Sequence, residues 1–162
     1  MEFITAATIF LASLNVSQKD CDFAYNVETT DHAVTSQVVY KKDEGKYLSH
    51  HLKYNYTYDE LQRLKKKEVL KWNTLSGKWE QSHCLNYVYD MLGYSIEYAL
   101  WNEKVGRYTD ATAKQIYDES ASGIITVVSY KWNKSDSNWV VQNNTVMMNA
   151  GRNLLSSLEL NP

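Results

Sequence analysis

Apolar and aromatic residues alternate with polar ones along much of the chain, and this period of two predicts β-strands. The pattern is clearest in HLKYNYTYDE, residues 51–60, where Tyr54, Tyr56 and Tyr58 fall on one face of a strand. Asp59 follows them, and an Asp at the first position of a turn accepts a hydrogen bond from a backbone N–H two residues later. The stretch therefore predicts a strand that ends where Asp59 begins a turn.

The same arrangement recurs with a period of roughly thirty residues. Each copy has an apolar run closed by an aromatic residue, a polar turn and a second aromatic residue. The first aromatics are Tyr40, Trp72, Trp101 and Trp132, spaced by 32, 29 and 31 residues, and the second are Tyr47, Trp79, Tyr108 and Trp139, with the same spacing. A closing Tyr-Asp pair repeats as Tyr58-Asp59, Tyr89-Asp90 and Tyr117-Asp118. Each period is typical of a strand-turn-strand-turn unit whose second turn begins at the Asp.

We therefore predict an all-β protein, an antiparallel meander of about four repeated β-hairpins with eight or nine strands. The sheet is expected to be either open and twisted or partly curled towards a barrel. A single domain over residues 18–162 would hold repeats at about 36–66, 67–94, 95–125 and 126–149. The segment CDFAYNVETT (21–30) predicts a further edge strand, and GRNLLSSLEL (151–160) an amphipathic tail that can cover an edge.

The chain opens with a mostly apolar run from Phe3 to Leu14. Its length is typical of a signal-peptide core and too short for a membrane span, so residues 1–17 are predicted to be a signal peptide. The alternative is a first buried strand or helix. An exported product would be periplasmic, exposed at the cell surface or secreted, and not an integral membrane protein. In such an oxidising compartment the only two cysteines, Cys21 and Cys84, can pair.

Composition narrows the expected partners. The 17 Lys and Arg residues are outnumbered by 19 Asp and Glu, and the net charge is −2, so nothing in the charge favours a nucleic acid. The aromatic residues are 13 Tyr and 5 Trp against 3 Phe, and rings with a polar handle suit half-exposed sheet faces. We expect an aromatic-rich sheet that is wetted on much of both faces.

The recurring tryptophans are the strongest candidates for a binding site. Each is followed by an asparagine, which gives the candidate residues Trp72, Asn73, Trp101, Asn102, Trp132 and Asn133. If exposed, the rings can pack on sugar rings while the amides bond the hydroxyls, and an envelope protein could use the same row as an anchor. The structural alternative is that these tryptophans cover the hairpin turns and pack on the second aromatics.

Catalysis is the runner-up interpretation, as a secreted hydrolase that uses carboxylates at the sheet edge. Its candidates are Asp59, Asp90 and Asp118, but their repetition is typical of turn residues rather than of an active site. A metal cluster of His50, His83 and Glu80 is conceivable, yet no spacing supports it, and no metal, cofactor or catalytic residue is predicted. A third possibility is a structural envelope component that assembles edge to edge, and the sequence leaves the oligomeric state open.

The runs YLSHHLKYNYTYDE, EVLKWNTLSGKWE, IEYALWNEKVGRYTD and SYKWNK together resemble an uncharacterised family of small secreted proteins from Bacteroides, catalogued as domain of unknown function 3836. The resemblance covers roughly residues 24–148. It implies a signal sequence and an exported β-rich product. It implies no activity and brings no catalytic residue.

Overall fold

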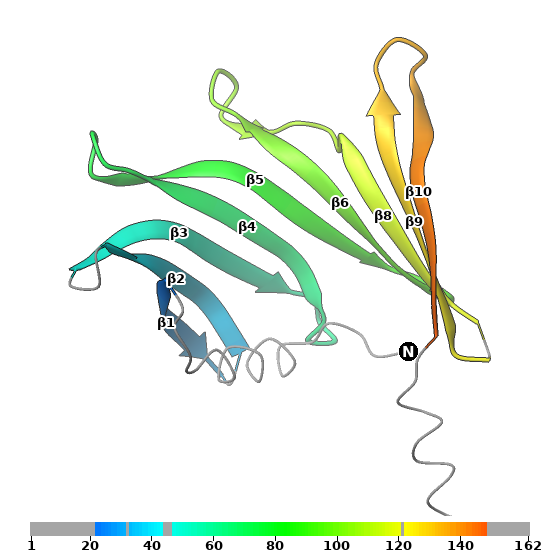
Figure 1. Ribbon diagram of the computed structural model, residues 1–162, viewed down its shortest axis with the longest axis horizontal. Coiled ribbons are helices and arrows are strands. Elements are labelled where there is room, and N and C mark those ends of the chain that lie inside the picture. Colours follow the sequence, from blue (N-terminus) through cyan, green and yellow to red (C-terminus); the bar gives the residue numbers. More distant parts are fainter. Residues whose placement is uncertain (1–21, 32, 44–46, 121, 149–162) are drawn as a thin grey trace, which may run out of the picture. The chain divides into compact units, whose positions relative to one another are not determined.

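The computed structural model describes residues 22–31, 33–43, 47–120 and 122–148, and every regular element in these ranges is a β-strand (Figure 1). The strands are β1 (Phe23–Thr30), β2 (Ala33–Asp43), β3 (Tyr47–Tyr58), β4 (Leu64–Asn73), β5 (Lys78–Tyr89), β6 (Gly93–Asn102), β7 (Arg107–Tyr108), β8 (Ala113–Glu119), β9 (Ile124–Asn133) and β10 (Asn138–Met148). The all-β prediction is confirmed.

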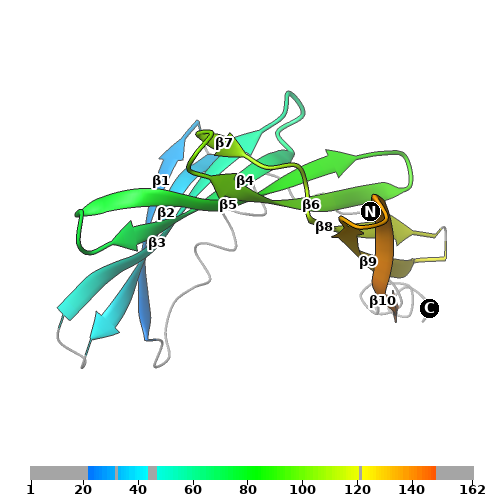
Figure 2. The ribbon, with the colours of Figure 1, turned by 90° about the horizontal axis from the view of Figure 1, so that it is seen from above.

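The strands follow a meander. Their hydrogen-bonded order is β1-β2-β3-β4-β5-β6-β8-β9-β10, and the two-residue β7 pairs only with the end of β6 (Figure 2). This order is linear, so the sheet is open rather than closed into a barrel. The segment predicted as an extra edge strand is β1, which pairs antiparallel with β2.

The described residues divide into two compact units. The first unit comprises those up to Asn86 together with Ala99–Asp110, and the second comprises Tyr87–Tyr98 and those from Ala111 onward. Strands β5 and β6 contribute to both units. The prediction of one domain over 18–162 stays a prediction, and each unit is described below by itself.

The core of the first unit is made by apolar residues of β2, β4, β5 and β6. Its buried side chains are Ala33, Val34, Val39, Leu64, Val69, Leu70, Cys84 and Ala99. The register shifts by one residue between Val39 and Tyr40, between Thr57 and Tyr58, and between Val69 and Leu70. Each shift changes which side chains share a face, because neighbouring residues of a strand point to opposite sides.

Two of the three predicted Asp turns are confirmed. The Asp59 carboxylate accepts hydrogen bonds from the backbone N–H groups of Leu61 (3.0 Å) and Arg63 (2.9 Å). Asp90 accepts from Leu92 (2.8 Å) and Gly93 (2.7 Å) in the same way. Both carboxylates therefore hold the turn that follows their strand.

The prediction for Asp118 is wrong. Strand β8 continues past Asp118, which pairs with Gly93 on one side and Thr126 on the other, as far as Glu119. The turn begins at Ser120, whose hydroxyl accepts the backbone N–H of Ile124 at 3.2 Å. A hydroxyl two residues later takes the place of the carboxylate because both neighbouring strands still offer partners at Asp118.

Several sequence predictions fall outside the described residues: the signal peptide at 1–17, the tail at 151–160, and Cys21 as a partner for Cys84. Cys84 itself is a free, buried thiol. None of the described segments is a helix of the length and apolarity that crossing a bilayer requires.

Candidate functional site

The aromatic residues at the hairpin ends form cross-strand pairs. The rings meet edge to face in all three later repeats, at centroid distances of 5.0 Å for Trp72–Trp79, 5.0 Å for Trp101–Tyr108 and 5.3 Å for Trp132–Trp139. All six rings are half-buried. The structure thus brings each candidate tryptophan onto its partner across the hairpin, and within the first unit no described ring contact joins Trp72 to Trp101.

The candidate asparagines shape the turns beside these rings. Each amide oxygen accepts the backbone N–H of the second residue after it, which is Leu75 for Asn73 (2.8 Å), Lys104 for Asn102 (3.1 Å) and Ser135 for Asn133 (3.0 Å). The Asn73 amide also donates to Glu80 at 2.6 Å. In each turn the asparagine side chain therefore forms a hydrogen bond with the backbone of a nearby residue. A role of these asparagines in binding stays a prediction.

The first repeat departs from the later ones. Tyr40 pairs with His50 rather than with Tyr47, which is 76% exposed. The His50 ring stacks on Trp72 at 4.4 Å and meets Trp79 edge-on at 5.4 Å. A histidine therefore takes the place of the second aromatic ring.

This arrangement separates the residues of the conceivable metal cluster. His50 lies among aromatic rings, His83 bonds Ser82 at 3.1 Å, and Glu80 accepts from Asn73. Among residues 22–31, 33–43, 47–120 and 122–148, no group of three or more His, Cys, Asp or Glu side chains is placed to hold a metal ion.

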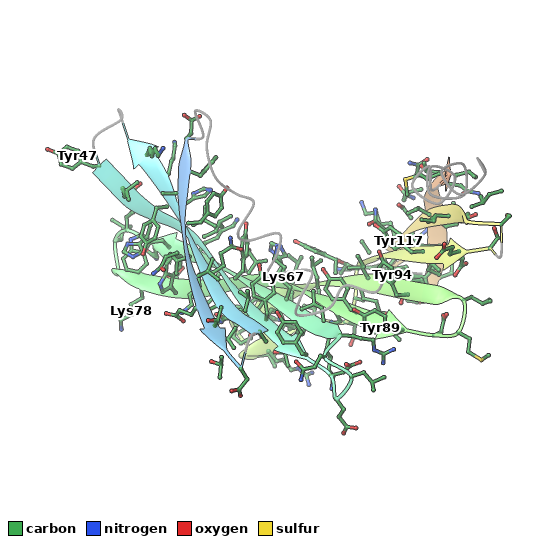
Figure 3. The ribbon with its side chains drawn as sticks, turned by 90° about the horizontal axis from the view of Figure 1, so that it is seen from below. Tyr47, Lys67, Lys78, Tyr89, Tyr94 and Tyr117 are labelled. Atoms are coloured by element: carbon green, nitrogen blue, oxygen red, sulfur yellow. The ribbon has the colours of Figure 1, made fainter. Side chains whose placement is uncertain are left out.

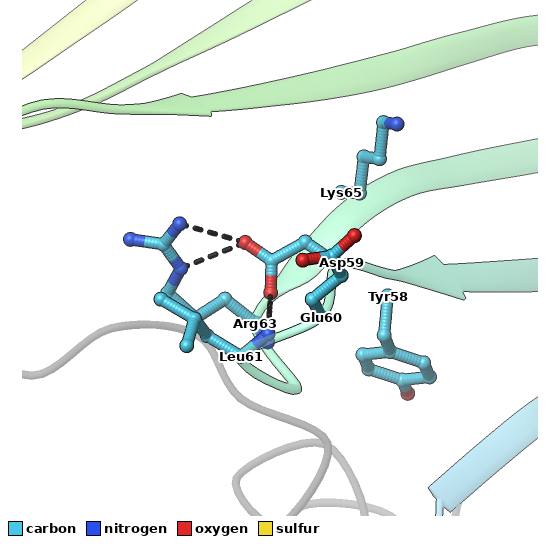
Figure 4. Close-up of a pocket in the computed structure, with 6 residues that line it drawn as sticks. All are labelled: Tyr58, Asp59, Glu60, Leu61, Arg63 and Lys65. Atoms are coloured by element: carbon cyan, nitrogen blue, oxygen red, sulfur yellow. Dashed lines mark hydrogen bonds and ion pairs between the residues drawn. The ribbon is translucent and has the colours of Figure 1, made fainter.

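An open hollow of about 410 Å³ lies at the turn between β3 and β4 (Figure 4), lined by Tyr58, Asp59, Glu60, Leu61, Arg63 and Lys65. The Arg63 Nε donates a hydrogen bond to the Asp59 Oδ2 at 2.8 Å. The Arg63 Nη2 forms an ion pair with the same oxygen, also at 2.8 Å. Partial burial opposes ionisation of Asp59, but the hydrogen bonds and charge of Arg63 outweigh it and lower the pKa of the carboxyl. Asp59 is thus an ionised turn residue already neutralised by Arg63.

The tyrosines of β3 lie on one face of the first unit, which we call the first tyrosine face: Tyr54, Tyr56 and Tyr58, with Lys67, Val69 and Lys71 of β4 and His83 and Leu85 of β5. The Tyr56 hydroxyl donates to the Gln37 amide oxygen at 3.1 Å, and that of Tyr58 to the Val34 carbonyl at 2.8 Å. Burial raises the pKa of Tyr58 to about 12. The Tyr58 phenol is therefore a neutral hydrogen-bonding group at physiological pH.

The second unit carries a second tyrosine face, which we define as Tyr87, Tyr89, Tyr94, Tyr117, Gln115 and Ser129. Tyr94 and Tyr117 lie side by side (Figure 3), with rings stacked at 4.7 Å and an interplanar angle of 10°. The Tyr89 ring lies 5.9 Å from that of Tyr94. Burial, and then the neighbouring Tyr94 and Tyr117, raise the pKa of Tyr87 to about 12.

A row of polar groups continues from the stacked rings. The Tyr117 hydroxyl donates to the Gln115 amide oxygen at 2.9 Å, and the Gln115 amide donates to the Ser129 hydroxyl at 3.2 Å. The register places Asn143 opposite Ser129, and the Asn143 amide donates to Thr145 at 3.3 Å. Three neighbouring strands thus place aromatic carbon, amides and hydroxyls together on one face.

Sequence reasoning reached these faces only in part. The period of two predicts that Tyr54, Tyr56 and Tyr58 share a face, but it does not single out Tyr94, and it assigns Tyr117 only to the end of a strand. Their meeting depends on the Tyr94–Tyr117 pairing between β6 and β8. The run YSIEY at 94–98 has the same period of two and is the signal that points to this face.

Comparison with known proteins supports the fold. The chain resembles the crystal structure of a protein of unknown function from Bacteroides fragilis NCTC 9343, with a TM-score of 0.67, 22% identity, and coverage of 83% of this chain and 96% of that one. Two further crystal structures are DUF3836 family proteins. That from Bacteroides vulgatus ATCC 8482 has a TM-score of 0.42 and 22% identity, covering 78% of this chain and 99% of that one. That from Parabacteroides distasonis ATCC 8503 has a TM-score of 0.43 and 18% identity, covering 83% and 96%.

No curated protein matches the chain. The model of the family described as "Family of unknown function (DUF3836)" matches residues 1–119, which is most of the chain. The resemblance inferred from the repeated motifs is thereby confirmed, and the chain belongs to the DUF3836 family.

Proposed function

We propose that this is an exported binding protein that recognises a glycan through its tyrosine faces and catalyses no reaction. The observation that carries the proposal is the second tyrosine face, where the stacked Tyr94 and Tyr117 rings lead directly into the Gln115 amide and the Ser129 hydroxyl. Export rests on the apolar run from Phe3 to Leu14, which has the length of a signal-peptide core.

The chemistry of this face matches that of a sugar. Tyrosine supplies rigid amphipathic contact area with little conformational entropy to lose, and its ring carbon can contact the C–H groups of a sugar ring. An amide offers both donors and an acceptor, and a serine hydroxyl that accepts one hydrogen bond can still donate its own hydrogen. The C–H groups of a saccharide can therefore contact the tyrosine rings while its hydroxyls form hydrogen bonds with the amide and the serine of the same face.

The hairpin-end tryptophans Trp72, Trp101 and Trp132 are alternative places for the same function, each within its own unit. Their rings are half-buried against their cross-strand partners, and the asparagines beside them are engaged in turns. The tyrosine faces are the better supported because their polar groups lie on the same side as the rings.

The proposal is tested by measuring binding of the purified protein to a panel of oligosaccharides, with intrinsic fluorescence as the readout. Gln115→Ala removes an exposed side chain from the second tyrosine face and is expected to weaken binding about fivefold, the value of one hydrogen bond. Gln81→Ala removes a matched exposed amide from β5 and should leave binding unchanged.

Other outcomes discriminate between the sites. If binding is lost in Trp101→Ala but kept in Gln115→Ala, the glycan binds at the hairpin end that carries Trp101 rather than on the second tyrosine face. No response of the unmodified protein to any member of the panel would overturn glycan recognition and direct attention to an envelope protein as the partner.

A further inference from the structure

Lys67 has an unusual place in the first unit. Lys67, labelled in Figure 3, lies near the middle of β4 in a half-buried position. The strand register places it on the first tyrosine face. Its ammonium nitrogen is 3.9 Å from the centre of the Tyr54 ring and 5.8 Å from that of Tyr56. A cation over an aromatic face is attracted by the ring quadrupole, so these rings hold the ammonium group in a defined position.

Within the part of the chain that the structure describes, no carboxylate neutralises this ammonium group. Among the described residues Lys67 has no ion pair and no hydrogen-bond acceptor, although an ammonium carries three donors. Its neighbour Lys66, whose side chain points to the opposite face, donates to Glu68 at 2.7 Å. Partly burying a charge without such a partner costs free energy, and burial accordingly lowers the pKa of Lys67.

Two further basic groups lie on the same face. His83 is opposite Val69, and Lys71 lies two residues beyond Val69 on the same side of β4. Burial lowers the pKa of His83 first, and the charges of Lys71 and Lys67 lower it further, so the three groups act on one another through space.

Among the described residues that pair with β4 on this face, Glu80 is the one carboxylate, and it is engaged elsewhere. Glu80 pairs with Lys71 across β4 and β5 in the part of the chain that the structure describes. Its Oε1 already accepts the Asn73 amide at 2.6 Å. The first tyrosine face therefore carries the positive charge of Lys67, and none of the described side chains on this face supplies a carboxylate to balance it.

We propose that Lys67 is the anchor of an anion site and that it binds the carboxylate of an acidic sugar, such as a uronic acid residue within a glycan. This rests on the proposed function, since it specifies that the glycan is acidic and that its charged group binds on the first tyrosine face. The carboxylate accepts from the ammonium group, while the sugar ring lies against the carbon of Tyr54 and Tyr56. The ligand supplies the charge that the face lacks.

The experiment compares an oligosaccharide that contains glucuronic acid with its carboxyl-reduced, neutral counterpart, by isothermal titration calorimetry at low ionic strength. The variant Lys67→Met keeps the length of the side chain and removes its charge. It is expected to lose about ten- to a hundredfold in affinity for the acidic sugar, the range of a charge-assisted hydrogen bond, and little for the neutral one. Lys104→Met removes an exposed lysine from the turn that follows β6, outside the first tyrosine face, and should bind as the unmodified protein does.

Equal affinity of the acidic and neutral sugars, unchanged in Lys67→Met, would overturn the anion site while leaving glycan binding in place. If a sulfated oligosaccharide binds in a Lys67-dependent way while the oligosaccharide that contains glucuronic acid does not bind, the assignment of a carboxylate ligand is overturned. Lys67→Met is expected to fold, because its side chain is apolar in a half-buried position. Far-UV circular dichroism checks this directly.

If no oligosaccharide binds at all, the proposed function fails and the anion site is decided separately. Sodium glucuronate is then titrated against sodium chloride of equal ionic strength while the His83 ring signals are followed by NMR. A shift specific to glucuronate and absent in Lys67→Met supports the site. The same spectra in both salts would overturn it.

Discussion

Gly93 is the position where one added methyl group should do most damage. It is buried at the start of β6, opposite Asp118 of β8. A Cβ placed there would overlap the Tyr117 carbonyl oxygen and lie 2.9 Å from its carbonyl carbon and 3.2 Å from the Asp118 Cα. These neighbours are backbone atoms, so β6 and β8 must separate to admit it.

The cost of Gly93→Ala follows from what this separation breaks. The pairs Gly93–Asp118 and Tyr94–Tyr117 lie at the point of contact. Losing about two backbone hydrogen bonds costs about 2 kcal/mol, and losing the stacked tyrosine pair about 1 kcal/mol more. We expect the free energy of unfolding to fall by about 3 kcal/mol, a large part of the 5 to 15 kcal/mol that is typical of a domain.

Urea denaturation followed by far-UV circular dichroism measures this loss. Gly77→Ala is the matched control, because Gly77 has a φ of 63° but nothing within 4 Å of an added Cβ. It should lose only about 1 kcal/mol, the cost of a left-handed alanine. A loss for Gly93→Ala no greater than that of Gly77→Ala would refute the reasoning from close backbone approach.

Three further predictions concern the turns, the rings and the half-buried lysine. Asp59→Asn should lower stability at neutral pH, because the ionised carboxylate accepts from Arg63. Since the folded pKa of Asp59 is lowered, its contribution is present above the unfolded value of 3.8 and lost as the pH falls through the folded pKa, so urea midpoints of the two proteins should converge in acid. Trp72→Ala should cost about 0.5 to 1.5 kcal/mol more than Trp101→Ala in urea denaturation, because Trp72 has a second ring contact; equal losses would show that the second contact contributes nothing. Lys67→Met should raise the thermal unfolding midpoint at pH 7, because it removes a charge whose burial destabilises the folded state. The gain should shrink as the pH rises through the lowered pKa of Lys67 towards 10.5, since the unmodified side chain then loses its charge. A lower midpoint for Lys67→Met would contradict this.

The sequence alone was enough to predict most of the strands, their order and their hairpins, but not the break that divides the second strand of the third repeat into β7 and β8. A period of two and a recurring aromatic-turn-aromatic unit are local signals, and in a meander each strand pairs with the next one along the chain. For the same reason Asp59 and Asp90 could be placed at turns, since each acts on backbone within a few residues. Asp118 was misplaced because the partners that extend β8 beyond it lie on other strands.

The candidate site depended on contacts that no local pattern contains. Single-residue register shifts decide which side chains share a face, and they put His50 rather than Tyr47 beside Tyr40. The Tyr94–Tyr117 stack depends on the register between β6 and β8, which the short β7 interrupts, and whether Lys67 meets a carboxylate depends on what faces it from β3 and β5. Periodicity assigns a residue to one side of its own strand, but only the pairing of strands determines its neighbours, and those neighbours set its chemistry.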